Sequence, residues 1–430
     1  MKIVENAVKG LTTALSKESN LNMALIQSSW RFYNNDRVDE NELFENIKDE
    51  NKNIIQNIEN DFVLVAHDWS WLDFKNHNSK EDLIVRNKKG NAKQRGYELH
   101  SSLVIDSNSG NPLTPIAMNL QTSKKIYSSY SKDLDITLTH LQELSKRCNY
   151  IDLEIKNINK NKKAVHMIDR EADSVLFVRE LQKENSLFLI RVKDNAKVYW
   201  DDKKIDIKQK DLSKELDFGK EVGSIKYHKK QARLFVNECD IIITRDYSKM
   251  TTDSDGKKRL TKIPGMPVKA RFIVSRVVNK DNKVLATWML ITNVDKQKVD
   301  TKSIATWYYY RWNIESYFKL LKTTGFNLEK WQQEKPLALF KRLIVVALSI
   351  VLVFKLANSN DENAKKIREF LVKLSGKLME YGVEYTLPAL LTGLWVFLRV
   401  MDVLNTFSIE ELNTLKNQAQ DILEFKLFEI

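Results

Sequence analysis

Cysteine is scarce in this chain of 430 residues. Cys148 and Cys239 are the only two, and they lie far apart in the sequence. Two cysteines exclude a disulfide framework and a structural zinc cluster of the four-ligand kind, and they fit a reducing compartment. We expect both to be ordinary buried or surface residues.

Apolar runs long enough to cross a membrane are also lacking. The first residues, MKIVENAVKGLTTALSK, have no apolar core of the kind that signal peptides carry. The longest apolar run, residues 343–354, is about two-thirds of the roughly 20 residues that span a bilayer. We therefore expect a buried helix at this run and a soluble, cytoplasmic protein.

Basic residues, in contrast, outnumber acidic ones. Lys and Arg number 69 against 57 Asp and Glu, which gives a net charge of +12 and a pI of about 9.2. Such a balance favours a polyanionic partner, because cationic side chains that neutralise phosphates release counterions. A Lys-rich surface without any partner explains the same numbers, so charge alone favours nucleic acid only slightly.

The order of predicted elements divides the chain into three parts. Residues 1–60 have a helical, polar pattern, and everything from Asp300 onward has a helical pattern. Between them, strands alternate with helices and then give way to a region made mostly of strands and turns. The expected strands are 62–66, 97–106, 111–123, 163–169 and 187–193, the expected helices are 131–160 and 172–183, and further strands lie at about 195–290.

This order predicts an α/β fold. Mixed strands with acidic residues at their ends, followed by a long helix, suit a core of the ribonuclease-H type, although periodicity does not choose it over other α/β folds. We expect a catalytic domain over 61–355 with a β-rich insertion at about 195–290. Helical regions over 1–60 and 356–430 flank it.

One predicted helix combines a carboxylate with phosphate-binding side chains. Asp300 is a plausible N-cap and Gly325 a plausible residue just past the C-terminus. At about 100° per residue, four polar residues fall within roughly 60° of one face. They are Tyr308, Arg311, Glu315 and Lys322.

Two interpretations of this face are open. Glu315 is suited to bind a metal ion while its neighbours hold phosphates. Alternatively the face is solvated and Arg311 pairs with Glu315 one turn away, which is common in helices. Helix geometry alone favours the second interpretation.

Two aspartates follow predicted strands. Asp68 comes after FVLVAH, and Asp169 comes after AVHMI and opens the segment DREADS. An acidic residue at the end of a strand can point out of the sheet and meet ligands from other elements. Taken singly, Asp68 is better explained as a turn residue or helix cap, and Asp169 as a partner of Arg170. Nearby acids are weaker candidates, and they are Asp73, Glu171 and Asp173.

Together these motifs resemble a bacterial insertion-sequence family of DDE transposases, to which the transposon-five transposase belongs. The family's signature, Tyr-x2-Arg-x3-Glu-x6-Lys, matches residues 308–322 without a gap, and its two aspartates match Asp68 and Asp169 in order. The resemblance implies a ribonuclease-H-like domain in which Asp68, Asp169 and Glu315 are catalytic. These carboxylates would hold two divalent ions, Mg²⁺ or Mn²⁺, about 3.5–4 Å apart.

The resemblance also implies contacts with DNA. Trp288 would stack on a base flipped out of the duplex, although a buried core tryptophan explains it equally well. Phosphate contacts, which position DNA without reading its sequence, are implied for several other residues. They are Tyr308, Arg311, Lys322, Arg191, Lys193 and Arg31. His67 adjoins Asp68 and His166 lies near Asp169, and both have the side chain of a metal ligand, but the family uses carboxylates, so we leave them out.

In function, the resemblance implies cut-and-paste transposition by a homodimer acting on two transposon ends in a synaptic complex. The N-terminal region would help to bind DNA, and residues 356–430 occupy the place of a dimerisation region. The alternative is a shortened, non-catalytic transposase that inhibits transposition by binding DNA or forming inactive dimers. The intact set of three carboxylates argues against this alternative. A sugar-active enzyme with paired carboxylates would not explain the basic charge.

Overall fold

The computed structural model describes residues 20–87, 93–227, 230–252 and 257–423. The chain forms two compact units, which are considered separately. The larger unit consists of residues 38–318 and 332–341, and the remaining residues make up the smaller one. These units divide the chain at other positions than the expected boundaries near 60 and 355, so the assignment of functional domains stays a prediction.

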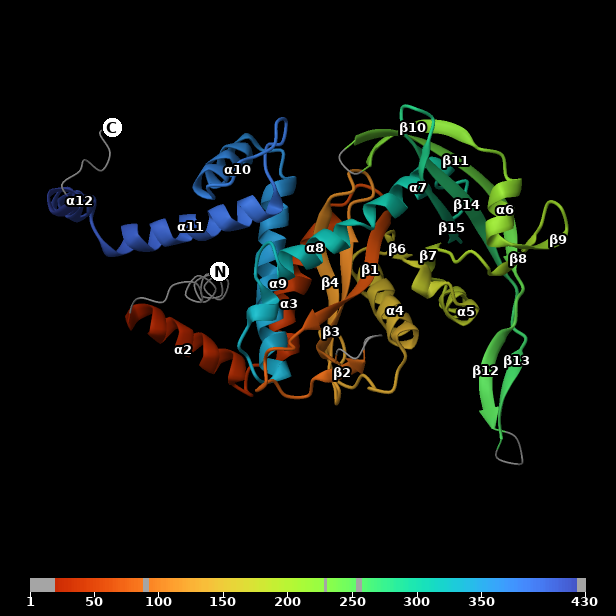
Figure 1. The fold of residues 1–430 in the computed structure, drawn as a ribbon, viewed down its shortest axis with the longest axis horizontal. Helices are drawn as coiled ribbons and strands as arrows, with labels where there is room; N and C mark the ends of the chain where they lie inside the picture. The colour runs from red at the N-terminus through yellow and green to blue at the C-terminus, as the bar shows by residue number, and fades with distance from the viewer. Residues whose placement is uncertain (1–19, 88–92, 228–229, 253–256, 424–430) are drawn as a thin grey trace. The chain divides into compact units, whose positions relative to one another are not determined.

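The larger unit is built on a mixed sheet (Figure 1). Within it, β1 (Phe62–Asp73) pairs antiparallel with β3 (Lys93–Ile105), which pairs antiparallel with β4 (Pro112–Gln121). On its other edge β1 pairs in parallel with β6 (Lys163–Ile168), and β6 in parallel with β7 (Leu187–Arg191). The predicted α/β class, with a large mixed sheet, is thereby confirmed.

Two helices cover one face of these strands. The first is α3 (Glu40–Gln56), capped by Asp39, and the second is α4 (His140–Ile158), which begins with a capping box at Thr139. Their apolar residues pack against valines of β1 and neighbouring strands in one buried cluster. The expected helix over 131–160 therefore begins only at His140, where Thr139 caps it.

Beyond β7 the sheet continues through antiparallel strands in the order β15, β14, β11, β8, β9. The helices α5 (Val175–Lys183) and α6 (Gln209–Glu215) pack into the apolar cluster on this part of the sheet. β12 and β13 form a separate two-stranded ribbon (Figure 1). The remaining bounds in this unit are β2 Ile84–Asn87, β5 Ile126–Ser128, β8 Lys197–Trp200, β9 Ile205–Lys208, β10 Lys220–Tyr227, β11 Lys230–Ile243, β12 Tyr247–Thr252, β13 Lys258–Ile263, β14 Val268–Val278, β15 Val284–Thr292 and the 3-10 turn Arg170–Ala172.

The helix expected between Asp300 and Gly325 is interrupted. Asp300 caps α7 (Thr301–Tyr310) as predicted, accepting a hydrogen bond from the Ser303 amide at 2.8 Å. The chain then turns at 311–312 and continues as α8 (Asn313–Lys322). Amides of residues 311, 312, 314 and 315 donate three residues back, so the junction is tightened into 3-10 geometry.

The predicted role of Gly325 is wrong. The helix ends earlier, at Lys322, and Gly325 is not among the glycines with positive φ. A Cβ at this glycine would instead lie 2.3 Å from the carbonyl oxygen of Leu320. Gly325 therefore permits a close approach of the chain to its own preceding helix.

The smaller unit is helical. It contains α2 (Asn20–Asn34), most of α9 (Pro336–Asn358), α10 (Glu362–Leu374), α11 (Leu387–Thr406) and α12 (Ile409–Leu423), with a 3-10 turn at Leu328–Lys330. Two of these helices, α9 and α11, are long and apolar enough to cross a membrane by length and composition alone. The apolar stretch of α9 is 83% buried inside the protein, which confirms the expected buried helix, whereas that of α11 is 22% buried.

Candidate active site

Asp68 lies inside a strand. The sequence predicted a strand end near this residue, but β1 runs on to Asp73 because its second half pairs with β3, where Asp68 lies opposite Ser101. The parallel pairing with β6 does end just before it, at Ala66. One carboxylate oxygen of Asp68 accepts a hydrogen bond from the Trp69 amide at 2.8 Å. The Asp68 side chain thus lies just past the point where the parallel pairing of β1 and β6 ends.

Asp169 directly follows β6, as predicted. Its Oδ1 accepts hydrogen bonds from the amide of Arg170 at 2.7 Å and from the hydroxyl of Tyr308 at 3.2 Å. The Arg191 guanidinium lies 3.7 Å from the same oxygen. The alternative that Asp169 pairs with the Arg170 side chain finds no support, because the described contact is to the Arg170 backbone.

The guanidinium of Arg311 joins all three predicted carboxylates. Its Nη1 lies 3.4 Å from Asp68 Oδ2, and its Nη2 lies 3.5 Å from Asp169 Oδ2 and 3.7 Å from Glu315 Oε1. The arginine side chain is only 6% exposed, while the three carboxylates remain partly open to solvent. The helix pair Arg311–Glu315 therefore exists, but as part of a four-residue cluster and not as a solvated surface pair.

The helix junction is anchored to the turn between β3 and β4. Trp307 donates from Nε1 to the Ser107 carbonyl at 3.1 Å, and Asn313 donates from Nδ2 to the Gly110 carbonyl at 2.8 Å. Gly110 has a φ of +76°, and a Cβ there would lie 2.4 Å from the ring of Tyr310. Only glycine fits at position 110, because the backbone there is left-handed and a Cβ would overlap the ring of Tyr310.

Burial and charge shift the titration of the site. Burial raises the pKa of Asp68, and Arg311 opposes that rise. Burial likewise raises the pKa of Tyr308 to about 12, so its hydroxyl stays a hydrogen-bond donor at neutral pH. The pKa of Glu171 is raised, first by burial and then by the charge of Asp68. Glu171 therefore lies within the field of the predicted carboxylates, although the sequence ranked it as a weaker candidate.

A cavity of about 610 Å³ opens beside the cluster. Glu315, Asp169 and Arg311 line it together with Trp288, which is half-buried. The indole packs near Tyr308 and Tyr309, with ring centroids 6.2 and 6.0 Å away. Trp288 therefore packs partly against neighbouring rings and partly faces the cavity, and its stacking on a flipped base stays a prediction. Three further aromatic residues line the cavity and were not predicted from the sequence: Tyr227, Tyr309 and Trp312. The aromatic run TWYYYRW could have indicated Tyr309 and Trp312.

Other predicted site residues lie elsewhere. Lys193 is exposed just past β7, and its amide donates to Asp173 at 2.7 Å. Arg31 is exposed on α2, and Lys322 pairs with Glu329 at 3.0 Å; both basic residues belong to the smaller unit. Of the weaker candidates, Asp173 is a buried partner of Arg245, and the Asp73 carboxylate accepts a hydrogen bond from the Lys75 amide after β1.

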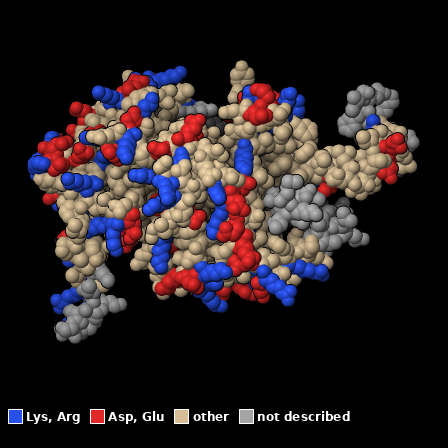
Figure 2. All heavy atoms as spheres, turned by 180° about the vertical axis from the view of Figure 1, so that it is seen from behind, with Lys and Arg blue, Asp and Glu red and all other residues tan. Residues whose placement is uncertain are grey.

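The surface in Figure 2 mixes Lys and Arg with Asp and Glu, so basic residues do not form a continuous patch on that face.

The three carboxylates offer the hard oxygen ligands that Mg²⁺ and Mn²⁺ prefer. They come from β1, the residue after β6 and α8, and each lies within 3.7 Å of the Arg311 guanidinium. Among the described residues, two groups of three side chains have potential metal-ligand atoms within 4.8 Å of one another. The first group is His67, Cys148 and His166, and the second is Glu98, His100 and His140. The second group also binds Arg86 through Glu98, which disfavours a cation there.

Comparison with protein families adds an independent finding. A family model described as the transposase DDE domain matches residues 63–352, which is more than half of the chain. The matched range contains the strands and helices that carry Asp68, Asp169 and Glu315. A search of curated proteins found no match to the sequence.

Proposed function

The chain belongs to the family of DDE transposases, and from this premise we propose that it cleaves DNA at transposon ends and joins those ends to target DNA. In this proposal Asp68, Asp169 and Glu315 are the catalytic residues. The enzyme would act in the bacterial cytoplasm, on the nucleoid, as a homodimer holding two ends in a synaptic complex.

The arrangement of three acids around Arg311 is the observation that carries the proposal. Residues 68, 169 and 315 come from three separate elements, yet each carboxylate lies within 3.7 Å of one buried guanidinium. The strand order β4-β3-β1-β6-β7, antiparallel and then parallel, is the order of a ribonuclease-H-like sheet. In such a sheet the first and fourth core strands bring two acids together. Here the first core strand is β1 and the fourth is β6, because the core strands in chain order are β1, β3, β4, β6 and β7.

We propose that the three carboxylates hold two divalent ions, Mg²⁺ or Mn²⁺. Such a pair supplies activation of the attacking oxygen and stabilisation of the leaving oxygen in an in-line displacement. Arg311 lies between the three acids, and its guanidinium would also suit a phosphate of bound DNA. Tyr308 keeps its proton and would continue to donate to Asp169, holding that carboxylate in place.

The basic and aromatic residues around the cavity would hold distorted DNA. Arg191 borders the cavity beside Asp169, where it suits the phosphate next to the scissile bond. Trp288 borders the cavity, which supports its proposed stacking on a flipped base. Lys193, Arg31 and Lys322 would each contribute a phosphate contact.

The reaction would follow the cut-and-paste course. Hydrolysis at the transposon end frees a 3′-hydroxyl, which attacks the opposite strand and closes a hairpin. A second hydrolysis reopens the hairpin, and the 3′-ends then attack target DNA. Each step is a phosphodiester displacement, so one set of carboxylates serves all of them.

Cleavage of DNA carrying the flanking inverted repeats, with Mg²⁺ or Mn²⁺, tests the proposal. The wild type should nick the ends in a metal-dependent manner, and Glu315→Gln, which keeps the shape but removes the charge, should abolish nicking. Glu362→Gln, an exposed change at the start of α10, serves as the control and should cleave normally. Tight DNA binding without cleavage by the wild type in either metal would overturn the proposal and identify an inhibitor of transposition.

A further inference from the structure

The face of the sheet opposite the carboxylate cluster carries a second group of metal-binding side chains. His67, His166 and Cys148 gather their ligand atoms within 4.8 Å of one another, and all three residues are buried. We propose that these three residues bind a thiophilic cation in the core of the larger unit, and we expect this cation to be Zn²⁺. This site is independent of the proposed DNA chemistry and of the Mg²⁺ or Mn²⁺ ions that the chemistry would use.

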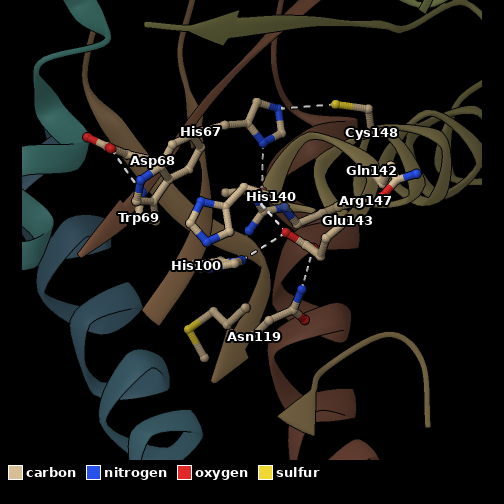
Figure 3. Close-up of polar contacts among 12 residues, drawn as sticks. His67, Asp68, Trp69, His100, Asn119, His140, Gln142, Glu143, Arg147 and Cys148 are labelled. Carbon is tan, nitrogen blue, oxygen red and sulfur yellow. Dashed lines mark hydrogen bonds and ion pairs between the residues drawn. The ribbon is translucent and has the colours of Figure 1, made fainter. Parts of the chain in front are cut away.

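The ligand atoms are spaced as a small ion requires. His67 Nε2 lies 2.9 Å from His166 Nδ1 and 3.9 Å from Cys148 Sγ. Zinc bonds of about 2.0 Å to nitrogen and 2.3 Å to sulfur imply tetrahedral separations of roughly 3.3 and 3.6 Å. The observed nitrogen–nitrogen separation is shorter than the expected one, and the nitrogen–sulfur separation is longer. Shifts of a few tenths of an ångström would bring both separations to the values for zinc. Figure 3 shows His67 on β1 and Cys148 on α4 pointing toward one another.

The positions of the three residues within their elements are unusual for such polar groups. Side chains alternate along a strand, so His67 continues the row of Val63 and Val65 that faces α4. On the neighbouring strand β6, His166 lies beside Val65 and follows Ala164 on the same face. Both rows are apolar until they reach the histidines, which then face the thiol of Cys148. The core thus contains a compact set of soft and borderline ligands where aliphatic packing would otherwise continue.

Each imidazole is also held by an outer partner. The second nitrogen of His67, Nδ1, lies 2.9 Å from the hydroxyl of Ser102, and that of His166, Nε2, lies 3.2 Å from a carboxylate oxygen of Asp152. The other oxygen of Asp152 accepts a hydrogen bond from Ser186 at 2.5 Å. Metal-binding histidines commonly use their second nitrogen in this way, because a carboxylate or hydroxyl fixes the ring and raises its basicity.

The ligand set determines the class of ion. Two imidazole nitrogens and one thiolate suit Zn²⁺ or Cu⁺, whereas Mg²⁺ and Mn²⁺ prefer oxygen ligands. Zn²⁺ would complete its tetrahedron with one water, and Cu⁺ accepts three ligands. Without an ion, a shared proton would link the two imidazoles in a hydrogen-bonded chain from Asp152 to Ser102. In such a chain Cys148 would pack in the apolar core with its thiol 3.9 Å from His67 Nε2, and the ion would use that thiol as a ligand.

The ion would join three elements behind the catalytic cluster. His67 directly precedes Asp68 on β1, and His166 lies three residues before Asp169, so the two histidines face α4 while the aspartates serve the other site. A metal bond between β1 and β6 would fix the spacing of the two strands that carry these aspartates. The proposed role of the site is therefore structural.

Metal analysis of the purified full chain tests the proposal. The protein is purified without chelator, and zinc and copper are quantified by mass spectrometry for the wild type, Cys148→Ser and the matched control Cys239→Ser, which changes the other buried cysteine. We expect about one zinc per chain in the wild type and in the control, and a loss of most of it in Cys148→Ser. Copper in place of zinc supports the same site and assigns Cu⁺ to it.

A spectrum of the wild type keeps the test decisive if Cys148→Ser does not fold. Co²⁺ added to metal-depleted wild type should give a thiolate-to-cobalt charge-transfer band together with intense visible bands of a tetrahedral ion. Glu315→Gln should give the same spectrum, because the carboxylate cluster is not involved. A wild type that neither contains nor takes up zinc or copper, or a Co²⁺ complex without thiolate absorption, would overturn the proposal.

Discussion

At the scale of single residues, Arg311 is the centre of the candidate active site. It is almost fully buried and contacts the carboxylates of Asp68, Asp169 and Glu315. Three acids packed this closely repel one another unless a cation lies among them. Either the guanidinium or metal ions can supply that positive charge, so the two should compete.

Arg311→Ala should therefore make the protein more dependent on metal. In chelator, we expect a lower melting temperature than that of the wild type, since the acids lose their counterion. The accompanying loss of unfolding free energy should be smaller than the roughly 3–5 kcal/mol that follows from breaking a fully buried ion pair, because the carboxylates are partly solvated. Addition of Mn²⁺ should raise the melting temperature more in the variant than in the wild type. Equal increases, measured by thermal unfolding, would contradict competition between Arg311 and the ions.

Glu143 on α4 predicts a specific dependence of stability on pH. Burial alone would raise its pKa, but the charge of Arg147 and a hydrogen bond from His100 outweigh burial and lower the pKa to about 2. Because the folded pKa lies below the unfolded value, this carboxylate stabilises the fold above about pH 4.5. The contribution, on the order of 3 kcal/mol, should disappear as the pH falls toward 2.

Urea unfolding of the wild type and Glu143→Gln at several pH values checks this expectation. The variant should be less stable near neutral pH, and the difference in the free energy of unfolding should shrink between pH 4.5 and 2. The exposed change Glu362→Gln should alter stability little at any pH. A difference for Glu143→Gln that does not change with pH would show that its carboxylate titrates normally.

At the scale of elements, the junction of α7 and α8 decides where the catalytic groups point. The sequence predicted one continuous helix between the N-cap Asp300 and Gly325. Contacts with the turn between β3 and β4, from Trp307 and Asn313, instead hold the chain at 311–312 in a tighter turn. These partners lie about 200 residues away in the sequence, so no local pattern could have indicated the break.

Gly110 provides a test of this junction. Gly110→Ala should displace the ring of Tyr310, shift Arg311 and lower DNA cleavage at least tenfold. Gly382→Ala is a matched control, because Gly382 has the same φ of +76° but nothing within 4 Å of a Cβ. Both variants should lose about 1 kcal/mol of backbone stability. Loss of cleavage in both, or in neither, would argue against a positioning role of the Tyr310 contact.

At the scale of the whole molecule, the net charge of +12 predicts a strong dependence of DNA binding on salt. Binding that neutralises phosphates releases counterions, so the logarithm of the affinity should fall linearly with the logarithm of the salt concentration. Because acidic and basic residues are mixed on the face shown in Figure 2, we expect particular lysines to matter more than the net charge.

Lys193→Gln should reduce the salt-dependent slope by about one, because it removes one proposed phosphate contact. Lys365→Gln is the control, since Lys365 pairs with Glu362 on the surface of α10. Titration of labelled end DNA at several salt concentrations measures both slopes. An unchanged slope for Lys193→Gln would remove this residue from the DNA interface.

The sequence by itself determined the family and the types of residue at the site. The spacing of residues 308–322 and the two aspartates after apolar strands required no knowledge of the fold, because signature spacing and strand patterning are local properties. It also indicated most strands near Asp68 and Asp169, since the buried strands are short apolar runs between turn residues.

Only the tertiary structure decided which residues meet. The extension of β1 past Asp68, the gathering of three acids around Arg311 and the cluster of His67, Cys148 and His166 all depend on pairing between distant segments. The sequence analysis left out the two histidines because the family uses carboxylates, and it treated the cysteine as an ordinary residue. Their chemistry arises from the packing of α4 on β1 and β6, because that packing brings a thiol and two imidazoles to one buried point.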